Sequence, residues 1–366
     1  MSFLYKKILR PIFFLFDPEW VHDRITKTGE FLGNCRFCRF LVQQLFSYSS
    51  PVLEQELWDI KFKNPVGLAA GFDKDAKLYS IMGSVGFGFT EIGTVTLESY
   101  KGNPKPRLYR LPKSKGLVVN YGLKNIGAKA VIESLKKKQK NIPQVISIGR
   151  TNSPKTANLD AGIDDYYDCL KKFIDSDIGD AYEINISCPN LFGGEPFNDE
   201  ISLQKLLQKI YTLNITKPVF IKMPINLSWS EFKKLVDTAL KFEVQALVIG
   251  NLNKDRNDSN IKDVIPENIK GSISGKPTRD LSNDLISKTY KNYGDKIKII
   301  GVGGTFSSQD AYQKIRLGAS MVELITGMIY EGPQLIGKIN KELVNLLKKD
   351  GYKNIAEAVG TLNRIK

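Results

Sequence analysis

The stretch "AYEINISCPNLFGG", residues 181–194, joins an apolar run directly to a polar loop that contains glycine. The run "YEINIS" predicts a strand buried on both faces, as in a parallel sheet. Similar runs occur eight times after residue 65, and amphipathic stretches separate them. The predicted strands are VGLAAG (66–71), TEIGTVT (90–96), VISIGR (145–150), YEINIS (182–187), VFIKMP (219–224), ALVIGN (246–251), IIGVGG (299–304) and VELITG (322–327).

Eight successive strand–helix units favour a closed (β/α)8 barrel, a TIM barrel, over an open doubly wound sheet. No G-x-G-x-x-G turn opens the first helix, which counts against an open dinucleotide-binding sheet. A hairpin is expected at 53–65, ahead of the first strand. We therefore expect an α/β fold with a barrel over residues 51–366, preceded by a small α-helical extension over residues 1–50. The helices expected in the barrel lie at 132–140, 203–213, 229–242, 308–317 and 333–347.

Small, amide, hydroxyl and basic residues gather where the predicted strands end, which is where such barrels carry their active sites. They include no acidic cluster, so we expect no metal site. Glycines after the last two strands, Gly303, Gly304 and Gly327, predict a phosphate site built from backbone N–H groups. Lys74 and Lys222 would balance a carboxylate or an electron-rich cofactor, or else extend from the rim to solvent. These features indicate a pocket for flavin mononucleotide (FMN) and a small anionic substrate.

The chain has four cysteines, too few for a disulfide scaffold, which indicates a reducing compartment. Cys35 and Cys38 form a C-x-x-C pair, but no second Cys or His pair follows at zinc spacing. We expect that pair to be incidental. Cys188 follows a strand directly and is either a small core residue or a reactive group. Spacing alone leaves both interpretations open.

The net charge of +14 favours anionic partners such as nucleic acid, anionic lipid or a phosphorylated ligand. The lysines are scattered and no nucleic-acid-binding motif is present, so we expect no nucleic-acid partner. No apolar run is long enough to span a membrane.

The first fifty residues form a different pattern. Three basic residues within 6–10 precede an apolar patch, and Asp17 before Pro18 predicts a helix start. A second amphipathic segment follows at 37–45. These helices either cap the barrel or lie on a bilayer surface, and the sequence leaves both open. His22, the one histidine of the sequence, is by itself expected to be structural.

Seven motifs along nearly the whole chain resemble those of the dihydroorotate dehydrogenase family. The amino-terminal "DPEWVH" (17–22) is similar to the membrane-associated, quinone-reducing class of that family. Together the motifs are highly specific, although no single one is. They are NPVGLAAGFDKDA (64–76), GFTEIGTVT (88–96), GNPKPRLYRL (102–111), NISCPN (185–190), SISGKP (272–277), IIGVGG (299–304) and GASMVELITGMIYEGP (318–333).

The resemblance implies FMN-dependent oxidation of (S)-dihydroorotate to orotate, with a membrane quinone as electron acceptor, in the de novo synthesis of UMP. The two leading helices would form a quinone tunnel containing His22 and Arg110. Cys188 would be the base that takes a proton from C5, and Lys74 would bind the substrate carboxylate. Further substrate contacts would come from Asn120, Asn185, Asn190 and Asn251. Cofactor contacts would come from Ala70, Gly71, Thr94, Ser147, Asn185, Lys222, Gly303, Gly304, Thr326 and Gly327.

Position 188 departs from the pattern of the quinone-reducing class, which normally has serine there. Cysteine is typical of the soluble classes, and the loop that follows it here also resembles theirs. A thiol is a stronger acid than a hydroxyl and ionises with less help, so the proton transfer survives this exchange.

Other departures concern the pyrimidine contacts. The family usually has asparagine at the position of Val119 and threonine at the positions of Gly250 and Leu252. Ser147 stands where asparagine is typical, and Ile325 where tyrosine often occurs. Either Asn120 and Asn253 compensate, or the site accepts a different ring.

Two alternatives to dihydroorotate oxidation therefore stay open. One is a paralogue that keeps FMN and quinone but dehydrogenates another small cyclic or carboxylated substrate. The other is a non-catalytic flavin-binding barrel. The absence of an Arg/Ser-rich transit peptide favours a peripheral location on the cytoplasmic face of a bacterial inner membrane.

Overall fold

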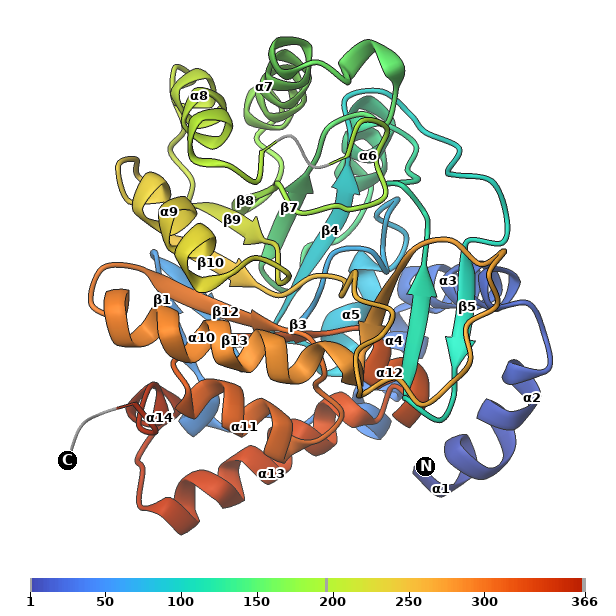
Figure 1. Cartoon of the computed structure of the whole chain (residues 1–366). Coiled ribbons are helices and arrows are strands. Elements are labelled where there is room, and N and C mark those ends of the chain that lie inside the picture. The colour runs from blue at the N-terminus through green and yellow to red at the C-terminus, as the bar shows by residue number, and fades with distance from the viewer. Residues whose placement is uncertain (1, 195–196, 364–366) are drawn as a thin grey trace.

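A closed parallel barrel of eight strands forms the body of the protein (Figure 1). The computed structural model describes residues 2–194 and 197–363. In chain order the barrel strands are β3 (Val66–Leu68), β4 (Phe89–Val95), β7 (Gln144–Ile148), β8 (Ala181–Asn185), β9 (Val219–Met223), β10 (Ala246–Ile249), β12 (Lys298–Val302) and β13 (Met321–Leu324). The predicted TIM barrel is confirmed. The predicted strands ran two or three residues too far at most C-terminal ends, because the glycines and polar residues there lie in loops.

Helices surround the barrel, and each of the predicted helices is present within a few residues of its expected start. The outer helices are α5 (Tyr79–Val85), α6 (Ala128–Lys136), α7 (Leu159–Asp175), α8 (Glu200–Ile210), α9 (Trp229–Ala239), α10 (Arg279–Tyr293), α11 (Ser308–Arg316), α12 (Thr326–Glu331), α13 (Leu335–Asp350) and α14 (Ile355–Ala358). Short 3-10 turns lie at Pro51–Leu53, Pro154–Thr156 and Lys276–Thr278.

The predicted hairpin is formed by β1 (Gln55–Leu57) and β2 (Ile60–Phe62). Trp58 in its turn packs on Phe220, and Phe62 packs on Phe89. Phe89 is the first residue of β4 and Phe220 the second of β9, so the hairpin closes the N-terminal end of the barrel. Ligands therefore reach the barrel at its opposite end.

The sequence did not predict a small antiparallel sheet, which flanks the C-terminal end of the barrel. It consists of β5 (Leu108–Leu111), β6 (Gly116–Val119) and β11 (Ser272–Gly275), with β6 in the middle. Each strand has four residues, and β11 is separated from the other two by more than 150 residues of chain. Strands this short carry little periodic signal.

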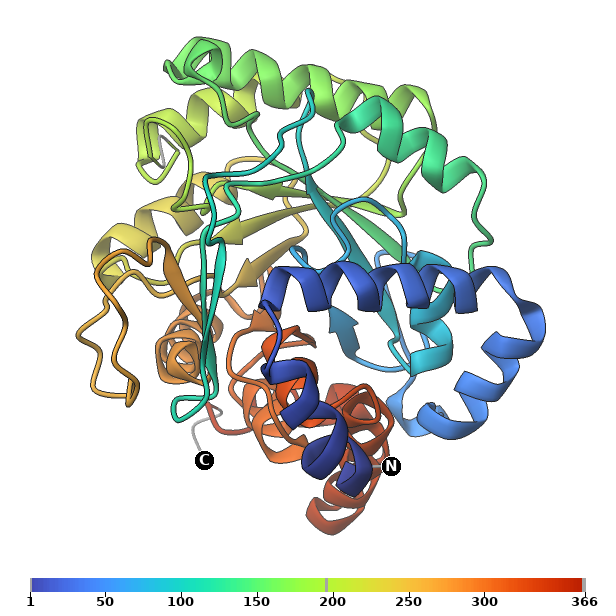
Figure 2. The same ribbon diagram turned by 90° about the vertical axis from the view of Figure 1, so that its right-hand side faces the viewer.

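The amino-terminal extension comprises α1 (Ser2–Leu4), a π-helical segment η1 (Tyr5–Leu9), α2 (Arg10–Phe14), α3 (Pro18–Asn34) and α4 (Arg36–Phe46). Asp17 caps α3 as predicted, accepting the N–H of Trp20 at 2.8 Å. Figure 2 shows α3 lying across the barrel, with α4 folded back beside it. The expectation that Cys35 and Cys38 are incidental is wrong, because they form a disulfide at the start of α4.

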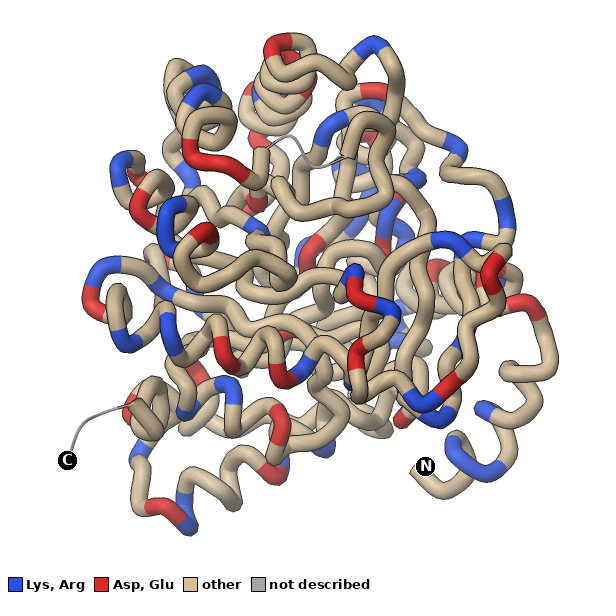
Figure 3. Tube along the Cα trace, viewed as in Figure 1, with Lys and Arg blue, Asp and Glu red and all other residues tan. Residues whose placement is uncertain are grey.

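The extension exposes a series of large apolar side chains. Leu15 is 83% exposed, Phe3 74%, Phe31 71% and Phe37 68%, whereas the barrel buries most of its large apolar residues. No helix within residues 2–194 and 197–363 has the length and apolarity needed to cross a bilayer. In the view of Figure 3, basic and acidic residues alternate along the outer helices, so the positive charge forms no single basic stripe on that side.

Candidate active site

One cavity opens at the C-terminal end of the barrel and collects most of the predicted site residues. It also reaches the extension, through His22 on α3, and the antiparallel sheet, through Leu108, Leu117 and Val119. The predicted residues on its wall are His22, Ala70, Gly71, Lys74, Thr94, Asn185, Cys188, Asn190, Lys222, Asn251, Gly303, Gly304, Thr326 and Gly327. Ser147, Asn120 and Arg110 do not line it.

A glycine cradle, defined here as Gly303, Gly304, Thr326 and Gly327, forms one end of this cavity. Gly303 and Gly304 have φ of +104° and +70°, which glycine adopts most readily. A Cβ on Gly304 would lie 2.3 Å from Cβ of Arg279, and one on Gly303 would lie 2.6 Å from Oγ1 of Thr278. Only bare backbone fits here, and its polar groups suit a phosphate. The cradle thus fits the phosphate of a flavin nucleotide.

Lys222 on β9 brings a buried positive charge to the floor of the cavity; its side chain is 5% exposed. Burial opposes that charge, but Glu183, Glu91 and Glu323 outweigh burial and raise the pKa of Lys222. The ammonium group is therefore charged at every physiological pH. It suits a cofactor that becomes more negative on reduction.

Three asparagines present their amides along the wall between Lys222 and the loop after β8. Asn185 donates to Oγ1 of Thr94 at 2.8 Å, and Asn251 donates to the carbonyl of Ser187 at 3.0 Å. Asn190 donates to the carbonyl of Val119 at 2.9 Å. Each of these three amides lines the cavity and also hydrogen-bonds a neighbouring segment of the chain.

Ser147, predicted to contact the cofactor, lies behind the wall instead. It is fully buried, and its hydroxyl is 2.8 Å from Oγ1 of Thr94. Its hydrogen bond orients Thr94, which does line the cavity.

Asn120 and Asn253, which could have replaced the missing pyrimidine contacts, are both engaged elsewhere. Asn120 accepts from Asn103 at 3.0 Å. Asn253 is fully buried, accepts from Asn226 and donates to Asp258, each at 2.8 Å. The wall itself carries Val119, Gly250, Leu252 and Ile325 at the divergent positions. Of the two alternatives left open by the sequence, compensation by Asn120 and Asn253 gains no support, because neither lines the cavity.

Cys188 lines the cavity with 8% of its surface exposed and takes part in no disulfide. Arg150, only 1% exposed, anchors the loop that follows: its guanidinium donates to the carbonyl oxygens of Phe192 at 2.6 Å and Gly194 at 3.3 Å. Its charge also acts on Cys188. A nearby guanidinium favours the thiolate form of a cysteine.

Two asparagines hold the same loop from the other side. Asn103 donates to the carbonyl of Asn190 at 3.1 Å, and Asn152 accepts the N–H of Phe192 at 2.7 Å. Sequence analysis missed Arg150, Asn103 and Asn152, because they act on backbone atoms far away in the chain. The sequence offered one signal for them: Arg150 and Asn152 are polar residues at or just beyond the end of a predicted strand, and Asn103 lies within the motif 102–111.

Lys74 stands opposite this loop, 9% exposed, with its Nζ 3.8 Å from the ring centroid of Tyr121. Burial lowers the pKa of Lys74 to about 8, which Asp75 opposes in part. No carboxylate lies within ion-pairing distance of its ammonium among the described residues. A cation so placed would gain from an anionic ligand.

His22 contributes α3's part of the wall. Its Nε2 donates to the carbonyl of Phe72 at 2.9 Å, and its Nδ1 is 3.4 Å from Oδ1 of Asp23. Burial lowers the pKa of His22, and the charge of Lys74 lowers it further, so the imidazole is neutral at pH 7.

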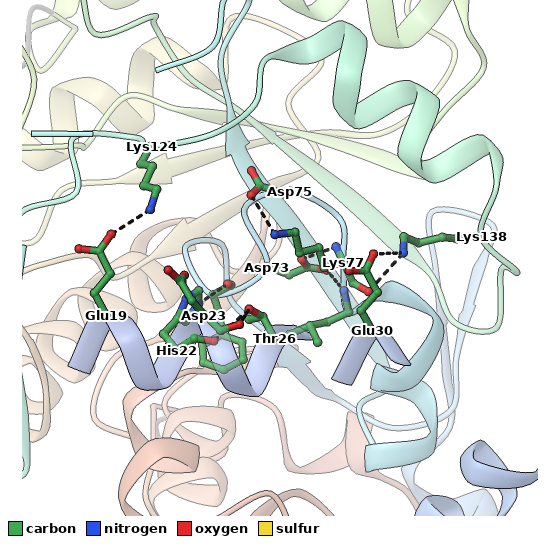
Figure 4. Close-up of polar contacts among 12 residues, drawn as sticks. Glu19, His22, Asp23, Thr26, Glu30, Asp73, Asp75, Lys77, Lys124 and Lys138 are labelled. Atoms are coloured by element: carbon green, nitrogen blue, oxygen red, sulfur yellow. Dashed lines mark hydrogen bonds and ion pairs between the residues drawn. The ribbon is translucent and has the colours of Figure 1, made fainter. Parts of the chain in front are cut away.

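Ion pairs fix α3 against the barrel (Figure 4). Glu19, 4% exposed, lies 2.8 Å from Lys124 and 2.9 Å from Arg107. Glu30 at the other end of the helix lies 3.1 Å from Lys138. In Figure 4 these acidic side chains point from α3 toward the barrel loops, with His22 and Asp23 between them. The helix is therefore a fixed wall of the cavity.

Arg110, expected as the partner of His22, is engaged with α2 instead. Its guanidinium donates to the carbonyl oxygens of Phe16 at 2.6 Å and Phe13 at 3.1 Å, and lies 4.6 Å from the ring of Phe14. These carbonyls end α2, so Arg110 acts as its C-terminal cap. The structure does not pair Arg110 with His22.

Comparisons with known proteins agree on one family. A family model described as "Dihydroorotate dehydrogenase" matches residues 52–347. The "Dihydroorotate dehydrogenase (quinone)" of Nostoc punctiforme is 35% identical over 370 residues, covering 98% of each chain. That of Crocosphaera subtropica is 36% identical and covers 94% of each chain. The crystal structure of DHODH from Eimeria tenella in complex with ferulenol has a TM-score of 0.82 at 27% identity, covering 95% of this chain and 96% of that one.

Proposed function

The chain belongs to the dihydroorotate dehydrogenase family, and from this premise we propose that it oxidises (S)-dihydroorotate to orotate with FMN and passes the electrons to a membrane quinone. The family is flavin-dependent, and its relatives here are of the quinone class. Its known role is pyrimidine biosynthesis. The observation that carries the proposal is the single cavity that reaches from the glycine cradle, past Cys188 and Lys74, to His22 on the extension.

The substrate is held by charge at one end and by amides along its ring. Lys74 binds the carboxylate, since this ammonium is buried and, among residues 2–194 and 197–363, has no carboxylate at ion-pairing distance. Asn185, Asn190 and Asn251 present donors and acceptors to the pyrimidine from the opposite wall. The groups come from different strands and loops, so they fix the ring in two directions.

Cys188 takes the proton from C5 of the substrate. Its Sγ lies in the loop clamped by Arg150, Asn103 and Asn152, which hold the thiol against the cavity and limit access of water. The charge of Arg150 favours the thiolate that this step requires.

FMN, when bound, supplies the acceptor for the hydride that leaves C6. The cradle residues Gly303, Gly304, Thr326 and Gly327 would hold its phosphate, and Ala70, Gly71 and Thr94 would contact its ring. Lys222 would stabilise the negative charge that the hydride brings.

The apolar end of the cavity is the quinone tunnel of this proposal. Leu108, Leu117 and Ile329 line it together with Phe72 and the neutral His22. Apolar walls with one polar side chain suit a quinone ring. Arg110 supports this tunnel by holding the end of α2.

We also propose residues 1–50 as a unit that docks on the cytoplasmic face of a bacterial inner membrane, with 51–366 as the FMN-binding barrel. The exposed Leu15 and Phe37 support this, because a bilayer would remove their side chains from water. The exposed Lys7 would face anionic headgroups, whereas Lys6 and Arg10 contact Glu331 and the carbonyl of Tyr330.

The catalytic proposal is tested by flavin bleaching. Purified protein loaded with FMN should lose its yellow colour when dihydroorotate is added without oxygen, and regain it with a short-chain quinone. Cys188→Ala should keep FMN but bleach about 10²–10⁴-fold more slowly. Cys169→Ala is the matched control, because Cys169 is also a buried cysteine outside the disulfide but lies on α7, away from the cavity. Equal bleaching of all three proteins would refute Cys188 as the base.

A second candidate substrate is favoured by one observation: Val119, Gly250, Leu252 and Ile325 all lie on the cavity wall. If dihydroorotate leaves the flavin oxidised at saturating concentration, the chain acts on another small cyclic or carboxylated substrate. If the purified protein takes up FMN but neither dihydroorotate nor a related small cyclic or carboxylated compound reduces it, the non-catalytic flavin-binding alternative gains and both enzymatic proposals fail.

Vesicle flotation tests the membrane surface. The full chain should float with vesicles containing phosphatidylglycerol, and the double variant Leu15→Glu, Phe37→Glu should not. Val264→Glu is the control, because Val264 is 88% exposed in a loop of the barrel. Flotation of the double variant like the wild type would contradict docking through the extension.

A further inference from the structure

Three buried glutamates surround Lys222 just below the cavity. Glu91 on β4 and Glu183 on β8 place carboxylate oxygens 3.2 Å and 3.4 Å from its Nζ, and both are fully buried. Glu323 on β13 is fully buried too, and its charge couples to the other three groups. Glu183 precedes the cavity residue Asn185 by two positions, and alternate residues of a strand share a face. The carboxyls therefore point into the barrel below the cavity residues.

The charges of this glutamate cluster, Glu91, Glu183 and Glu323, exceed that of Lys222. With every group ionised, three carboxylates would face one ammonium in a layer closed to water. Burial of uncompensated like charges is too costly, so such groups keep protons instead. Neither carboxyl oxygen of Glu323 has a hydrogen-bond partner among the described residues, which makes its ionised form still less favourable.

The contacts indicate which carboxyl is ionised. Glu91 accepts the N–H of Ala70 at 3.0 Å in addition to its contact with Lys222, so two donors face its carboxyl group. Burial, followed by the charge of Glu91, raises the pKa of Glu183 to about 8 and that of Glu323 well above its usual range. Lys222 lowers both pKa values, the hydroxyl of Ser147 also lowers that of Glu183, and the charge of Glu183 further raises that of Glu323.

We propose that the glutamate cluster is a proton store: in solution alkaline enough to ionise a second carboxyl of the cluster, it takes up one proton from solvent when the bound flavin is reduced. The inference rests on the proposed function, because it needs a flavin beside Lys222. Reduction adds negative charge at the edge facing Lys222, and that charge strengthens proton binding by carboxylates one layer below. The cluster would then keep the floor of the cavity near neutrality in both redox states.

The balance of this step is simple. The substrate loses a hydride from C6, which carries two electrons and one proton to the flavin ring. It also loses a proton from C5, which goes to Cys188. A third proton enters from solvent and binds one carboxylate oxygen of the cluster. When quinone removes the two electrons, the protonated carboxyl of the cluster releases its proton. The quinone takes up two protons in all and becomes the quinol.

The midpoint potential of the bound flavin tests the proton store. A two-electron reduction that takes up one proton shifts by about 30 mV per pH unit, and one that takes up two protons shifts by about 60 mV. The midpoint potential of the FMN-loaded full chain is measured against reference dyes from about pH 6 to about pH 10. Its slope should increase from about 30 to about 60 mV per pH unit above pH 8, because Glu183 begins to ionise there in the oxidised protein.

Two isosteric variants locate the proton. Glu183→Gln and Glu323→Gln each remove one titrating carboxyl at nearly constant volume and should weaken or abolish the steepening. Glu200→Gln, on the exposed α8, should leave it intact. Reduced-minus-oxidised infrared difference spectra of the wild type provide a readout that requires no variant. A protonated-carboxyl band should appear on reduction and shift in D2O.

A slope near 30 mV across the whole range, with no carboxyl band, would overturn the proton store while leaving the proposed function standing. A protein that binds no flavin, or whose flavin dihydroorotate does not bleach, would instead refute the proposed function. A steepened slope that persists in both Gln variants would also overturn the assignment to these carboxyls.

Discussion

Binding of the anionic product should weaken as the pH rises through about 8, because Lys74 loses its charge there. Burial holds the pKa of Lys74 at about 8 instead of its ordinary value. Only the protonated ammonium pairs with a carboxylate, so the affinity is full below pH 8 and falls above it. A bound carboxylate raises the pKa of Lys74, which is the same coupling viewed from the other side.

The size of the effect follows from the titration. Above pH 8 the charged fraction of Lys74 falls about tenfold per pH unit, which costs about 1.4 kcal/mol of binding per unit. Lys74→Met should remove the pair altogether, at about 1.5–3 kcal/mol, or roughly 10- to 100-fold in Kd at neutral pH. In that variant the pH dependence should vanish.

Orotate is the suitable probe, since it binds without being oxidised, and its binding can be followed through the absorbance of the bound flavin. The measurement is made in a Cys188→Ala background, so that the thiol does not titrate in the same range. Lys77→Met is the matched control: Lys77 lies on the same loop, but its side chain pairs toward Asp75 and does not line the cavity.

An orotate Kd that stays constant from about pH 7 to about pH 9 would refute the assignment of Lys74. The same holds if Lys74→Met binds orotate as tightly as Lys77→Met does.

Three further variants separate the parts of the site. Gly304→Ala should abolish FMN binding, measured as flavin content, because the new Cβ would lie 2.3 Å from Cβ of Arg279. Gly351→Ala is its control and should retain FMN, because Gly351 has a similar positive φ but open space around it. Arg150→Met should slow dihydroorotate-driven bleaching at least about 10-fold at unchanged flavin content, since two charge-assisted hydrogen bonds to the catalytic loop are lost; unchanged bleaching would contradict the clamp. Arg110→Met should slow quinone reoxidation in stopped-flow measurements and leave bleaching unchanged; equal loss in both half-reactions would argue against a role confined to α2.

The barrel was predictable because its strands bury both faces and leave long apolar runs in the sequence. The cavity wall was predictable for a related reason: the ends of parallel strands converge, so residues such as Lys222, Asn185 and Gly303 must meet. The antiparallel sheet was not predictable, because four-residue strands carry no clear period and β11 is remote in the chain.

The errors have a common physical origin. Ser147 and Asn120 stand at the expected positions, yet hydrogen bonds with Thr94 and Asn103 hold them off the cavity wall. Such competition depends on partners that only the folded chain brings near. The glutamate cluster lies one layer below the strand ends, so the rule that places barrel active sites at those ends does not point to it. Its signal was present, since a glutamate inside an otherwise apolar strand needs a buried partner.

The ion pairs of α3 continue beyond Glu19 into the active site. Arg107, which pairs with Glu19, also donates to the carbonyl of Asn103, and Asn103 in turn holds Asn190 in the cysteine loop. Two side chains thus link α3 to the asparagines of the cavity wall. Shortened versions of an enzyme with an amino-terminal extension are a usual route to tractable samples for crystallisation and inhibitor screening. Here, a version lacking α3 would leave Arg107 without its carboxylate and loosen the substrate side of the site, so the full chain is the appropriate sample for both half-reactions.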